Sequence, residues 1–420
     1  MTKVESAFLQ LLKTAISGDA AEDPELDPAE WSALLTMAKR QKLLPLLLHT
    51  AAGIPSYRKA CSSNTSTQKP DGKALLDASL QEIYRQVFQE NELLNLLLSL
   101  RQEGLEPVMV KGVVLRQLYP ISFLRPSVDE DLLISPLEAR AYHTALTAQG
   151  LIPDEPDIEL DSASECSYHR PQTPTYLEVH QALFDPASPV YGNFNLLFNG
   201  YESRAVTMKV QDVTFRTLCP SDHLLFLILH AYKHFVHSGF GLRIAADICL
   251  FAQKYADQIE MDAIYSDCRD QRCHRFAAAV FQIGDRYLGI AAPEPFASAQ
   301  CDIDPLLEDM LCAGLHGQDI DRLHSANITL GSIADDRKGK DRSSVSMRTS
   351  LFPSAESLKN RYPYLSKHSW LLPVAWTQRI GSYLFHNTST KPAAHPKESI
   401  RIGKERVALL RQYGIIGKDE

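Results

Sequence analysis

Two aspartates separated by one residue, in the run Asp129-Glu130-Asp131, could together bind a metal ion. Side chains alternate between the two faces of a strand, so Asp129 and Asp131 share one face and Glu130 occupies the other. Carboxylates on one face repel each other unless a cation lies between them, and Mg²⁺ prefers oxygen ligands of this kind. The apolar residues 132–134 predict a strand anchored in a core. We therefore expect a divalent-metal site at the edge of this strand.

The same acid–x–acid pattern occurs twice more, in Asp302-x-Asp304 and Asp319-x-Asp321, and by itself it is a weak signal. A proline directly follows the first pair, and the second pair runs into a polar stretch. Neither pair has the apolar continuation of a strand, so we expect both to be solvated surface acids.

Four histidines, His223, His230, His234 and His237, recur at spacings that place them on one face of a helix. Three interpretations are open: a polar seam packed against the catalytic part, a contact to substrate or phosphate, and a zinc site. Zinc needs a further ligand, and no Glu follows His230 as in the H-E-x-x-H motif, so the packing seam is favoured. Asp247 could orient one of these imidazoles through a hydrogen bond.

The elements that must position these residues follow from hydrophobic periodicity. Apolar residues at helical spacing predict helices over 4–18, 29–50 and 74–102, with a polar linker over 62–73. The third helix is expected to bury a stripe made of Leu75, Leu80, Ile83, Val87, Leu93, Leu94 and Leu97. Gly104 follows it as a C-terminal cap.

From residue 107 the pattern changes to short apolar runs alternating with short helices, which is typical of a mixed α/β domain. The expected strands cover 107–110, 128–134, 157–170, 175–182 and the region 206–218, with helices at 113–119 and 135–149. Helices return at 221–237, 243–256, 260–268, 272–287, 303–314 and 400–413.

We therefore predict the α+β class, with a small mixed-sheet catalytic domain flanked by N-terminal and C-terminal helical regions. The expected divisions are an N-terminal helical region 1–84, a catalytic α/β domain 85–218, a helical domain 219–330, a flexible linker 331–350 and a C-terminal helical region 351–420. The linker is expected because its composition is rich in Ser, Lys, Arg and Asp.

Composition narrows the functional classes. The chain has 420 residues, 43 basic and 51 acidic side chains, a formal net charge of -8 and 45% apolar residues. These values exclude a wholly disordered chain, a collagen-like repeat and a small disulfide scaffold. The acidity argues against a broad phosphate-backbone binder, which needs a basic face.

Location follows from other features of the sequence. No apolar run reaches the roughly 18 residues of a membrane helix, and the N-terminus lacks the features of a signal peptide. The eight scattered cysteines lack the paired spacing of a zinc site and predict reduced thiols. We therefore expect a cytoplasmic protein without a membrane partner.

Around the acid strand the sequence resembles the nucleotidyltransferase superfamily, which has the polymerase-beta-like fold. Within it, the chain is most similar to a bacterial family described only as uncharacterised nucleotidyltransferases. The residues that carry the resemblance are, in order, Lys111-Gly112, Arg125-Pro126, the acid strand and Glu178-Val179-His180. Further likeness in residues 229–234, 243–247 and 351–378 extends it over most of residues 85–380.

The resemblance implies metal-dependent nucleotidyl transfer. An acceptor hydroxyl would attack the α-phosphate of an NTP, expected to be ATP, and pyrophosphate would leave. Asp129 and Asp131 would hold Mg²⁺ or Mn²⁺, and Glu178 would complete the site as a metal ligand or as a general base.

The remaining site residues have supporting roles in this interpretation. The expected phosphate contacts are Lys111, Gly112 and Arg125, although Lys111 and Arg125 could also be plain surface cations. The residues expected to support the ligands or to contact substrate are His180, His230, His234 and Asp247. Arg116 is expected to be a surface charge.

Two departures from the superfamily pattern leave alternatives open. Val113 replaces the second small residue of the glycine turn, and Glu130 replaces an apolar residue and must find water or a basic partner. One alternative is a catalytically weakened member that binds a nucleotide or a partner protein. Another is a Mg-ATP phosphotransferase in a peptide- or polysaccharide-modifying pathway. Net charge favours a small-molecule or protein acceptor over long nucleic acid, while a tRNA end stays open.

Overall fold

The structure is a computed structural model that describes residues 1–62, 69–156, 159–161, 163–313, 320–337, 362, 364–385 and 396–417. The chain divides into two compact units. The first comprises residues 1–231 and 241–303, and the second comprises residues 232–240 and 304–420. Asp319, residues 338–350 of the predicted linker and residues 351–361 lie outside the described residues.

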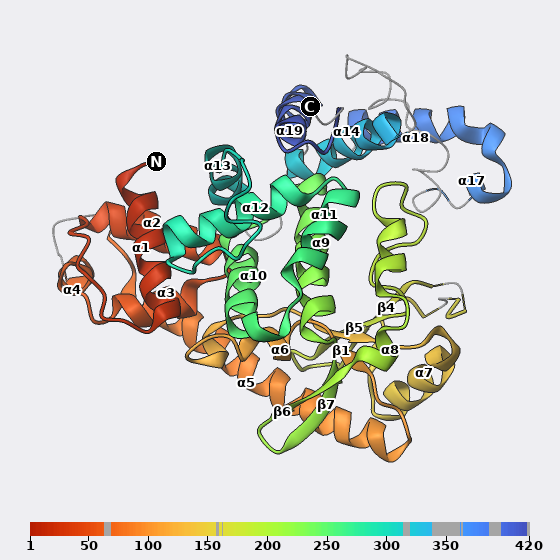
Figure 1. The fold of residues 1–420 in the computed structure, drawn as a ribbon, viewed down its shortest axis with the longest axis horizontal. Helices are drawn as coiled ribbons and strands as arrows, with labels where there is room; N and C mark the ends of the chain where they lie inside the picture. Colours follow the sequence, from red (N-terminus) through yellow and green to blue (C-terminus); the bar gives the residue numbers. More distant parts are fainter. Residues whose placement is uncertain are drawn as a thin grey trace. The chain divides into compact units, whose positions relative to one another are not determined.

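Within the described residues of the first unit, seven strands form one mixed sheet (Figure 1). The strands are β1 (Val108–Met109), β2 (Glu130–Leu133), β3 (Ile152–Pro153), β4 (Glu165–His169), β5 (Tyr176–His180), β6 (Val206–Val210) and β7 (Val213–Thr217). Their order across the sheet is β3-β4-β5-β2-β1-β7-β6. The central strand β2 runs antiparallel to β1 and parallel to β5. The predicted mixed sheet is confirmed.

The register of the parallel pair β2–β5 decides where the acidic side chains lie. Asp131 is paired with Glu178, and Leu133 is paired with His180. Paired residues on neighbouring strands point to the same face, so Asp131, Glu178 and His180 share one face of the sheet. All four residues of β2 are buried. Glu130 and Asp131 therefore project from opposite faces of a strand within the core.

Helices cover both faces of the sheet, with α5 on one side and α9 and α10 on the other (Figure 1). The helices that follow the N-terminal region are α5 (Gly72–Gln102), α6 (Val113–Arg116), α7 (Ala139–Ala148), α8 (Tyr201–Arg204), α9 (Pro220–His237), α10 (Leu242–Lys254), α11 (Met261–Asp270) and α12 (His274–Ile283). Short 3-10 turns are η1 (Ser122–Leu124), η2 (Pro136–Glu138), η3 (Gly192–Phe198) and η4 (Ala256–Gln258), and the π turn η5 is Gly284–Leu288. The predicted arrangement of a sheet with flanking helices, the α+β class, is confirmed.

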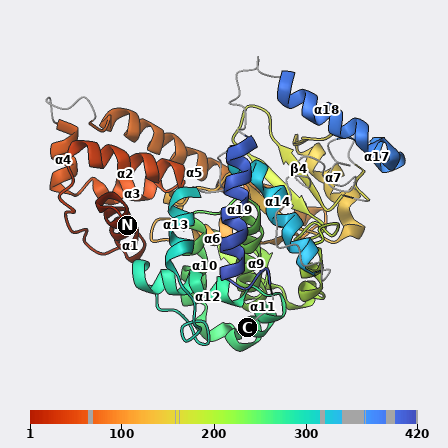
Figure 2. The same ribbon diagram turned by 90° about the horizontal axis from the view of Figure 1, so that it is seen from above.

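Four helices pack together in the described N-terminal residues, seen from above in Figure 2. They are α1 (Lys3–Ser17), α2 (Pro28–Arg40), α3 (Leu44–Ala51) and α4 (Pro55–Ser62). The prediction of one helix over 29–50 is wrong. Lys42 has a left-handed φ of 55°, and Pro45 lies in the first turn of α3. Proline suits a first turn but interrupts a helix interior, so a new helix begins there.

The inward face of α5 differs from the predicted apolar stripe. Its C-terminal half does bury leucines of that stripe, including Leu93 and Leu97, but Leu80 is 52% exposed. In the middle of the helix the buried positions are polar: Gln86 is 0% and Gln89 is 1% exposed. These amides are buried because they bond backbone groups of the segments that lead into β2 and β5.

The second unit is helical in its described part. Its helices are α13 (Asp304–Ala313), α14 (Ile320–Arg337), α17 (Tyr364–Lys367), the 3-10 turn η6 (Ser369–Leu371), α18 (Leu372–Phe385) and α19 (Pro396–Gln412). α14 and α19 lie side by side in both views (Figure 1, Figure 2). Arg406 of α19 forms a buried ion pair with Asp309 of α13 at 2.8 Å. The predicted linker 331–350 begins inside α14, which remains helical as far as Arg337.

Candidate active site

The buried carboxylate of Asp131 is the centre of the candidate site. Asp131 is 0% exposed, and its Oδ1 lies 2.7 Å from Lys111 Nζ and 3.0 Å from His180 Nε2. Lys111 comes shortly after β1, and the Val110 N–H donates to the backbone carbonyl of Asp131. The pairing of β1 with β2 therefore brings this lysine to the acid.

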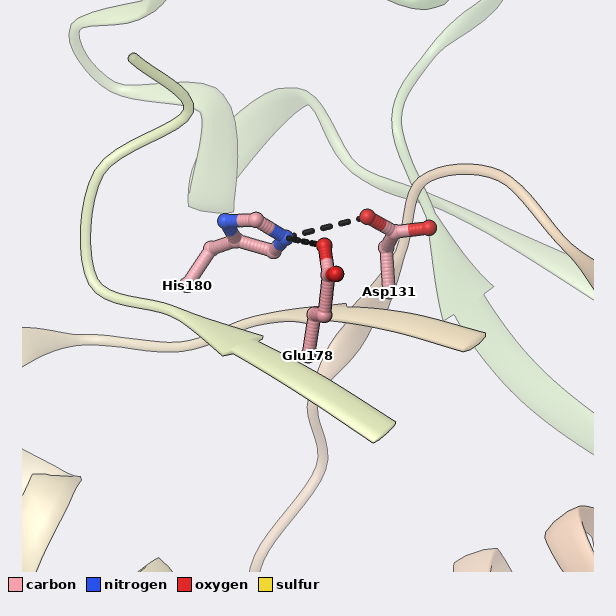
Figure 3. Close-up of side chains that lie close together, drawn as sticks. All are labelled: Asp131, Glu178 and His180. Carbon is pink, nitrogen blue, oxygen red and sulfur yellow. Dashed lines mark hydrogen bonds and ion pairs between the residues drawn. The ribbon is translucent and has the colours of Figure 1, made fainter. Parts of the chain in front are cut away.

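Glu178 and His180 extend from β5 toward Asp131, as Figure 3 shows. His180 Nε2 lies 3.6 Å from Glu178 Oε2, and His180 Nδ1 lies 3.4 Å from Glu165 Oε2 on β4. One ligand atom each from Asp131, Glu178 and His180 falls within 4.8 Å of the other two. Two carboxylates and an imidazole thus converge on one point of the sheet.

Charges at the site are strongly coupled. Burial would raise the pKa of Asp131, but the charge of Lys111 and the contacts with His180 lower it to about 2. Burial would lower the pKa of Lys111, yet the surrounding carboxylates hold that pKa above its usual value. Burial also acts to lower the pKa of His180, but hydrogen bonds to Asp131 and Glu178 raise it to about 9. At neutral pH an ionised Asp131 therefore faces two cations.

Asp129 behaves differently from Asp131. It precedes β2 and is half-buried, and burial together with the neighbouring Asp131 raises its pKa. Asp129 also lies outside the group of three residues whose ligand atoms converge. Its charge nevertheless acts on Lys111, so it belongs to the same electrostatic cluster.

A divalent cation fits this arrangement. Asp131 Oδ2 is buried and has no hydrogen-bond partner, which is uncommon for a buried carboxylate oxygen. Oxygen ligands suit Mg²⁺, and Mn²⁺ also accepts an imidazole nitrogen. The structure thus brings together two of the three predicted ligands, Asp131 and Glu178. The third member of the converging group is His180, for which the sequence predicts a supporting role.

The turn at Gly112 binds an internal anion. The Val113 N–H, directly after the predicted phosphate contact Gly112, donates to Glu130 Oε2 at 2.8 Å. Gly112 has a φ of 46°, and a Cβ there would collide with the Glu130 carboxylate, so only glycine fits. The extra carboxylate in the acid strand is therefore accommodated by the turn that the sequence predicts as a phosphate contact.

Arg116 is the basic partner that Glu130 requires. The prediction that Arg116 is a surface charge is wrong, because it is 0% exposed. Its Nη2 lies 2.6 Å from Glu130 Oε1, and its Nε lies 3.3 Å from Glu90 Oε2 on α5. In the sequence Arg116 has the position of an exposed helix residue, one turn after Gly112. Its ion pairs with Glu130 and with Glu90 of α5 form only in the folded structure.

Arg125 and Asp247 bond each other. Arg125 was predicted to contact phosphate and Asp247 to orient an imidazole. In the structure Arg125 is 3% exposed and donates from Nε and Nη2 to the two Asp247 oxygens, at 3.0 and 2.7 Å. Tyr119 also donates to Asp247. Arg243, one helical turn before Asp247, donates to the Pro126 carbonyl, so α10 holds the loop that leads to Asp129.

A family model described as uncharacterised nucleotidyltransferase matches residues 27–289, more than half of the chain. The chain belongs to this family. No curated protein and no solved structure matches it. The matched residues contain the sheet and every predicted site residue, whereas the C-terminal stretch 351–378 lies outside them.

Membership makes the protein a nucleotidyltransferase, and its central sheet with helices on both sides is consistent with that fold. A nucleotide substrate follows from the family. None of the helices in the described residues is long and apolar enough to cross a membrane.

The histidines of this nucleotidyltransferase fall in different environments. His223 is 0% exposed, bonds the Val110 carbonyl and packs against the Phe251 ring at a tilt of 42°, so it is a packed residue as the seam interpretation predicts. His230 is half-buried, and its Nε2 lies 3.4 Å from Lys111 Nζ. His234 and His237 belong to the second unit. The one candidate metal group found in the described residues includes none of the four.

A cavity of about 300 Å³ lies on the sheet next to the site. Its lining includes Glu165 and Ser167 of β4 and Tyr176 of β5. In the β4–β5 register these strands pair Glu165 with His180 and Ser167 with Glu178. Glu165, Ser167 and Tyr176 therefore lie on the face of the sheet that carries the converging ligands, which themselves do not line the cavity.

Proposed function

We propose that the protein transfers a nucleoside monophosphate, AMP from ATP, to the hydroxyl group of an acceptor. The observation that carries this proposal is the unsatisfied Asp131 Oδ2, which stands beside Glu178 and Lys111 in a chain of the nucleotidyltransferase family. A buried carboxylate with an unused oxygen is costly unless a ligand completes it. A cation held between Asp131 and Glu178 would complete this oxygen.

Asp131 and Glu178 would hold Mg²⁺ or Mn²⁺ here, with Asp129 beside them and His180 within ligand distance. Such an ion supplies charge neutralisation for the phosphates of the donor and for the leaving pyrophosphate. Lys111 Nζ lies 2.7 Å from Asp131 Oδ1, so its ammonium group would be available to bind the phosphates of the donor nucleotide. His230, 3.4 Å from its Nζ, limits where that ammonium group can move.

In the proposed reaction Glu178, whose role as a ligand or as a general base the sequence leaves open, would act as the general base. Its side chain is partly exposed, and the residue paired with it on β4, Ser167, lines the cavity. Glu178 would take the proton of the acceptor hydroxyl as the new bond to the α-phosphorus forms. The bond from that phosphorus to the oxygen of the β-phosphate breaks, and pyrophosphate leaves. His180 is protonated at neutral pH and its Nε2–H orients Asp131, so it would have to lose that proton before Nε2 could bind a metal.

The acceptor is expected to be a small molecule or an exposed group of a protein. The net charge of -8 disfavours a long nucleic acid, and a cavity of about 300 Å³ beside Glu178 suits a compact group.

We propose that the protein acts in the cytoplasm. The eight cysteines, all within the described residues, are free thiols, as is usual for proteins of that reducing compartment.

ATP labelled at the α- or γ-phosphate, incubated with the protein, Mg²⁺ or Mn²⁺ and a cell extract, tests the proposal. The expected result is α-label on a product and labelled pyrophosphate from the γ-label. Transfer of γ-label to a product instead would replace nucleotidyl transfer by phosphotransfer, the alternative in which the same acids hold Mg-ATP.

One observation favours a second candidate, a weakened enzyme that mainly binds a nucleotide. The Val113 N–H is already occupied by Glu130, so the glycine turn has one donor fewer for a triphosphate. In that case the label experiment gives no product from either ATP, while equilibrium dialysis shows saturable ATP binding. Turnover of α-label would exclude this candidate.

A further inference from the structure

A single side-chain amide on α5 joins the two segments that carry the acids. Gln89 is 1% exposed, and its Nε2 donates to the Val128 carbonyl at 3.0 Å and to the Pro174 carbonyl at 2.7 Å. Val128 lies directly before Asp129, and Pro174 lies four residues before Glu178. Gln89 therefore spans the starts of the two strands whose side chains form the candidate site.

The position of these two carbonyls explains why a side chain is needed. The β2–β5 ladder begins with Glu130 opposite Leu177, so Val128 and Pro174 lie just before its first pair. Two carbonyl oxygens cannot bond each other, and both would repel if brought together unaided. A primary amide offers two N–H groups on one nitrogen and satisfies both acceptors at once. Gln89 thus acts as an additional rung that extends the ladder toward the site.

Gln86, one turn earlier on the same buried face, provides a contrast. Its Nε2 donates to the Ser127 carbonyl at 2.9 Å, and its Oε1 accepts from the Ser127 N–H at 2.8 Å. Both of these contacts are to the segment before β2, and Gln86 Nε2 also donates within α5 to Glu82 Oε1 at 3.1 Å and to Gln89 Oε1 at 3.2 Å. Gln86 therefore bonds the backbone before one strand, whereas Gln89 bonds the backbone before both strands.

We propose that Gln89 is a positioning residue that sets the spacing between the carboxylates of Asp131 and Glu178. Ligands on two different strands coordinate one ion only when the strands keep their separation to within a few tenths of an ångström. The proposal rests on the metal centre proposed above and assigns its geometry to a helix that contributes no ligand. Loss of the bridge is expected to weaken metal binding more than its loss of fold stability accounts for.

Mn²⁺ titration of the purified full-length protein, by calorimetry or by electron paramagnetic resonance, tests this without any acceptor. Gln89→Leu keeps the side-chain size and removes both donors, and Gln86→Leu is its matched control on the same face. Asn91→Ala is a second control, since Asn91 is exposed and donates only to Val87 of its own helix. Gln89→Asn withdraws the amide by one methylene and replaces Gln89→Leu if the latter does not fold. Thermal melting is recorded for each variant.

The expected result is an Mn²⁺ affinity about tenfold lower in Gln89→Leu, the size of effect seen when supports behind metal ligands are removed. Gln86→Leu is expected to lose less than about threefold, although both variants melt at lower temperature, and Asn91→Ala is expected to match the wild type. An unchanged affinity in folded Gln89 variants, or an equal loss in Gln86→Leu, would overturn the inference alone. Failure of the wild type to bind Mn²⁺ would overturn the inference and the proposed metal centre together.

Discussion

The two faces of strand β2 carry buried acids that are adjacent in sequence and opposite in character. Glu130 Oε1 forms an ion pair with Arg116 Nη2 at 2.6 Å, and its Oε2 accepts the Val113 N–H, so one oxygen has an ionic partner and the other a hydrogen-bond donor. Asp131, on the other face, uses Oδ1 on Lys111 and His180 and leaves Oδ2 without a partner. Both residues are at most 1% exposed.

This difference separates a structural charge from a functional one. A buried acid that is held by an arginine and a backbone N–H already has its counter-charge, and changing it affects folding. A buried acid with an oxygen that lacks both an ion-pair and a hydrogen-bond partner, next to a second acid on the neighbouring strand, can still accept a ligand. Burial is similar on the two faces, and the unpartnered Asp131 Oδ2 distinguishes them.

The largest expected effect is on the Asp131 face. Asp131→Asn should lower nucleotidyl transfer at least about a thousandfold and abolish Mn²⁺ binding, because the ion loses a charged ligand. The pKa of Asp131 is lowered from 3.8 to about 2, so its ionised form stabilises the fold above pH 4, and that contribution is lost as the pH falls to 2. The variant should therefore unfold about 2 kcal/mol more easily at pH 7, as measured in urea.

Asp129→Asn is the matched control for that stability effect. It should also reduce turnover, but the raised pKa of Asp129 means that its charge is disfavoured in the folded protein. Neutralising it should leave stability unchanged or slightly increased. Wild-type activity in both variants would place the active site elsewhere.

On the Glu130 face we expect the reverse pattern. Glu130→Gln leaves the buried Arg116 short of negative charge and should cost about 3 kcal/mol in urea unfolding. Turnover per folded molecule, measured by α-label transfer, should stay within about threefold of the wild type, as for substitutions away from the reacting groups. A loss of turnover as severe as in Asp131→Asn would remove the distinction between the two faces.

His223 extends the comparison because it bonds the carbonyl of Val110, the residue before Lys111, and does not contact Asp131 in the described residues. Burial lowers the pKa of His223 from 6.5 to about 4, so the unfolded chain takes up a proton that the folded protein refuses. The wild type should lose up to about 3 kcal/mol from this group as the pH falls from 7 to 4.

His223→Gln should be less stable than the wild type at pH 7, by about 1–3 kcal/mol, since the bond to the Val110 carbonyl is lost. It lacks the titrating imidazole, so the gap should narrow toward pH 4. Parallel stability curves for the two proteins across that range would show that His223 does not titrate as described.

The smallest effect is expected for Asp302, an acid that does not lie on strand β2. Asp302 is exposed and begins one of the two other acid–x–acid patterns. Asp302→Asn should change turnover less than about threefold and stability by less than about 0.5 kcal/mol. A loss comparable to that of Asp131→Asn would mean that the wrong acid pair was chosen.

Several parts of the site could be predicted from local sequence. Residues 129–134 show an acid–x–acid run that turns apolar, and this pattern alone indicates a strand with carboxylates on one face. The ordered motifs then pointed to Glu178, which the structure pairs with Asp131. Long helices such as α5 were also readable, because a helix of that length repeats its periodicity many times.

Other residues carried no local signal that identified their role. Gln89 and Arg116 have the composition of surface helix positions, yet they are buried because their partners are backbone and acidic groups far along the chain. The signal that could have located Gln86 and Gln89 is their spacing from Leu93 and Leu97, which continues the buried face of α5. Because Gln86 and Gln89 are polar, hydrophobic periodicity alone does not assign them to the buried face of α5.

The sequence by itself determined which residue types are available and which face of a strand or helix each one occupies, because backbone geometry repeats every few residues. It therefore determined that Asp129 and Asp131 point away from Glu130. Only the tertiary structure decided which of these buried acids is satisfied. Hydrogen bonds and ion pairs require distances near 3 Å, and the chain brings Arg116 to Glu130, and His180 and Lys111 to one oxygen of Asp131, only by pairing its strands.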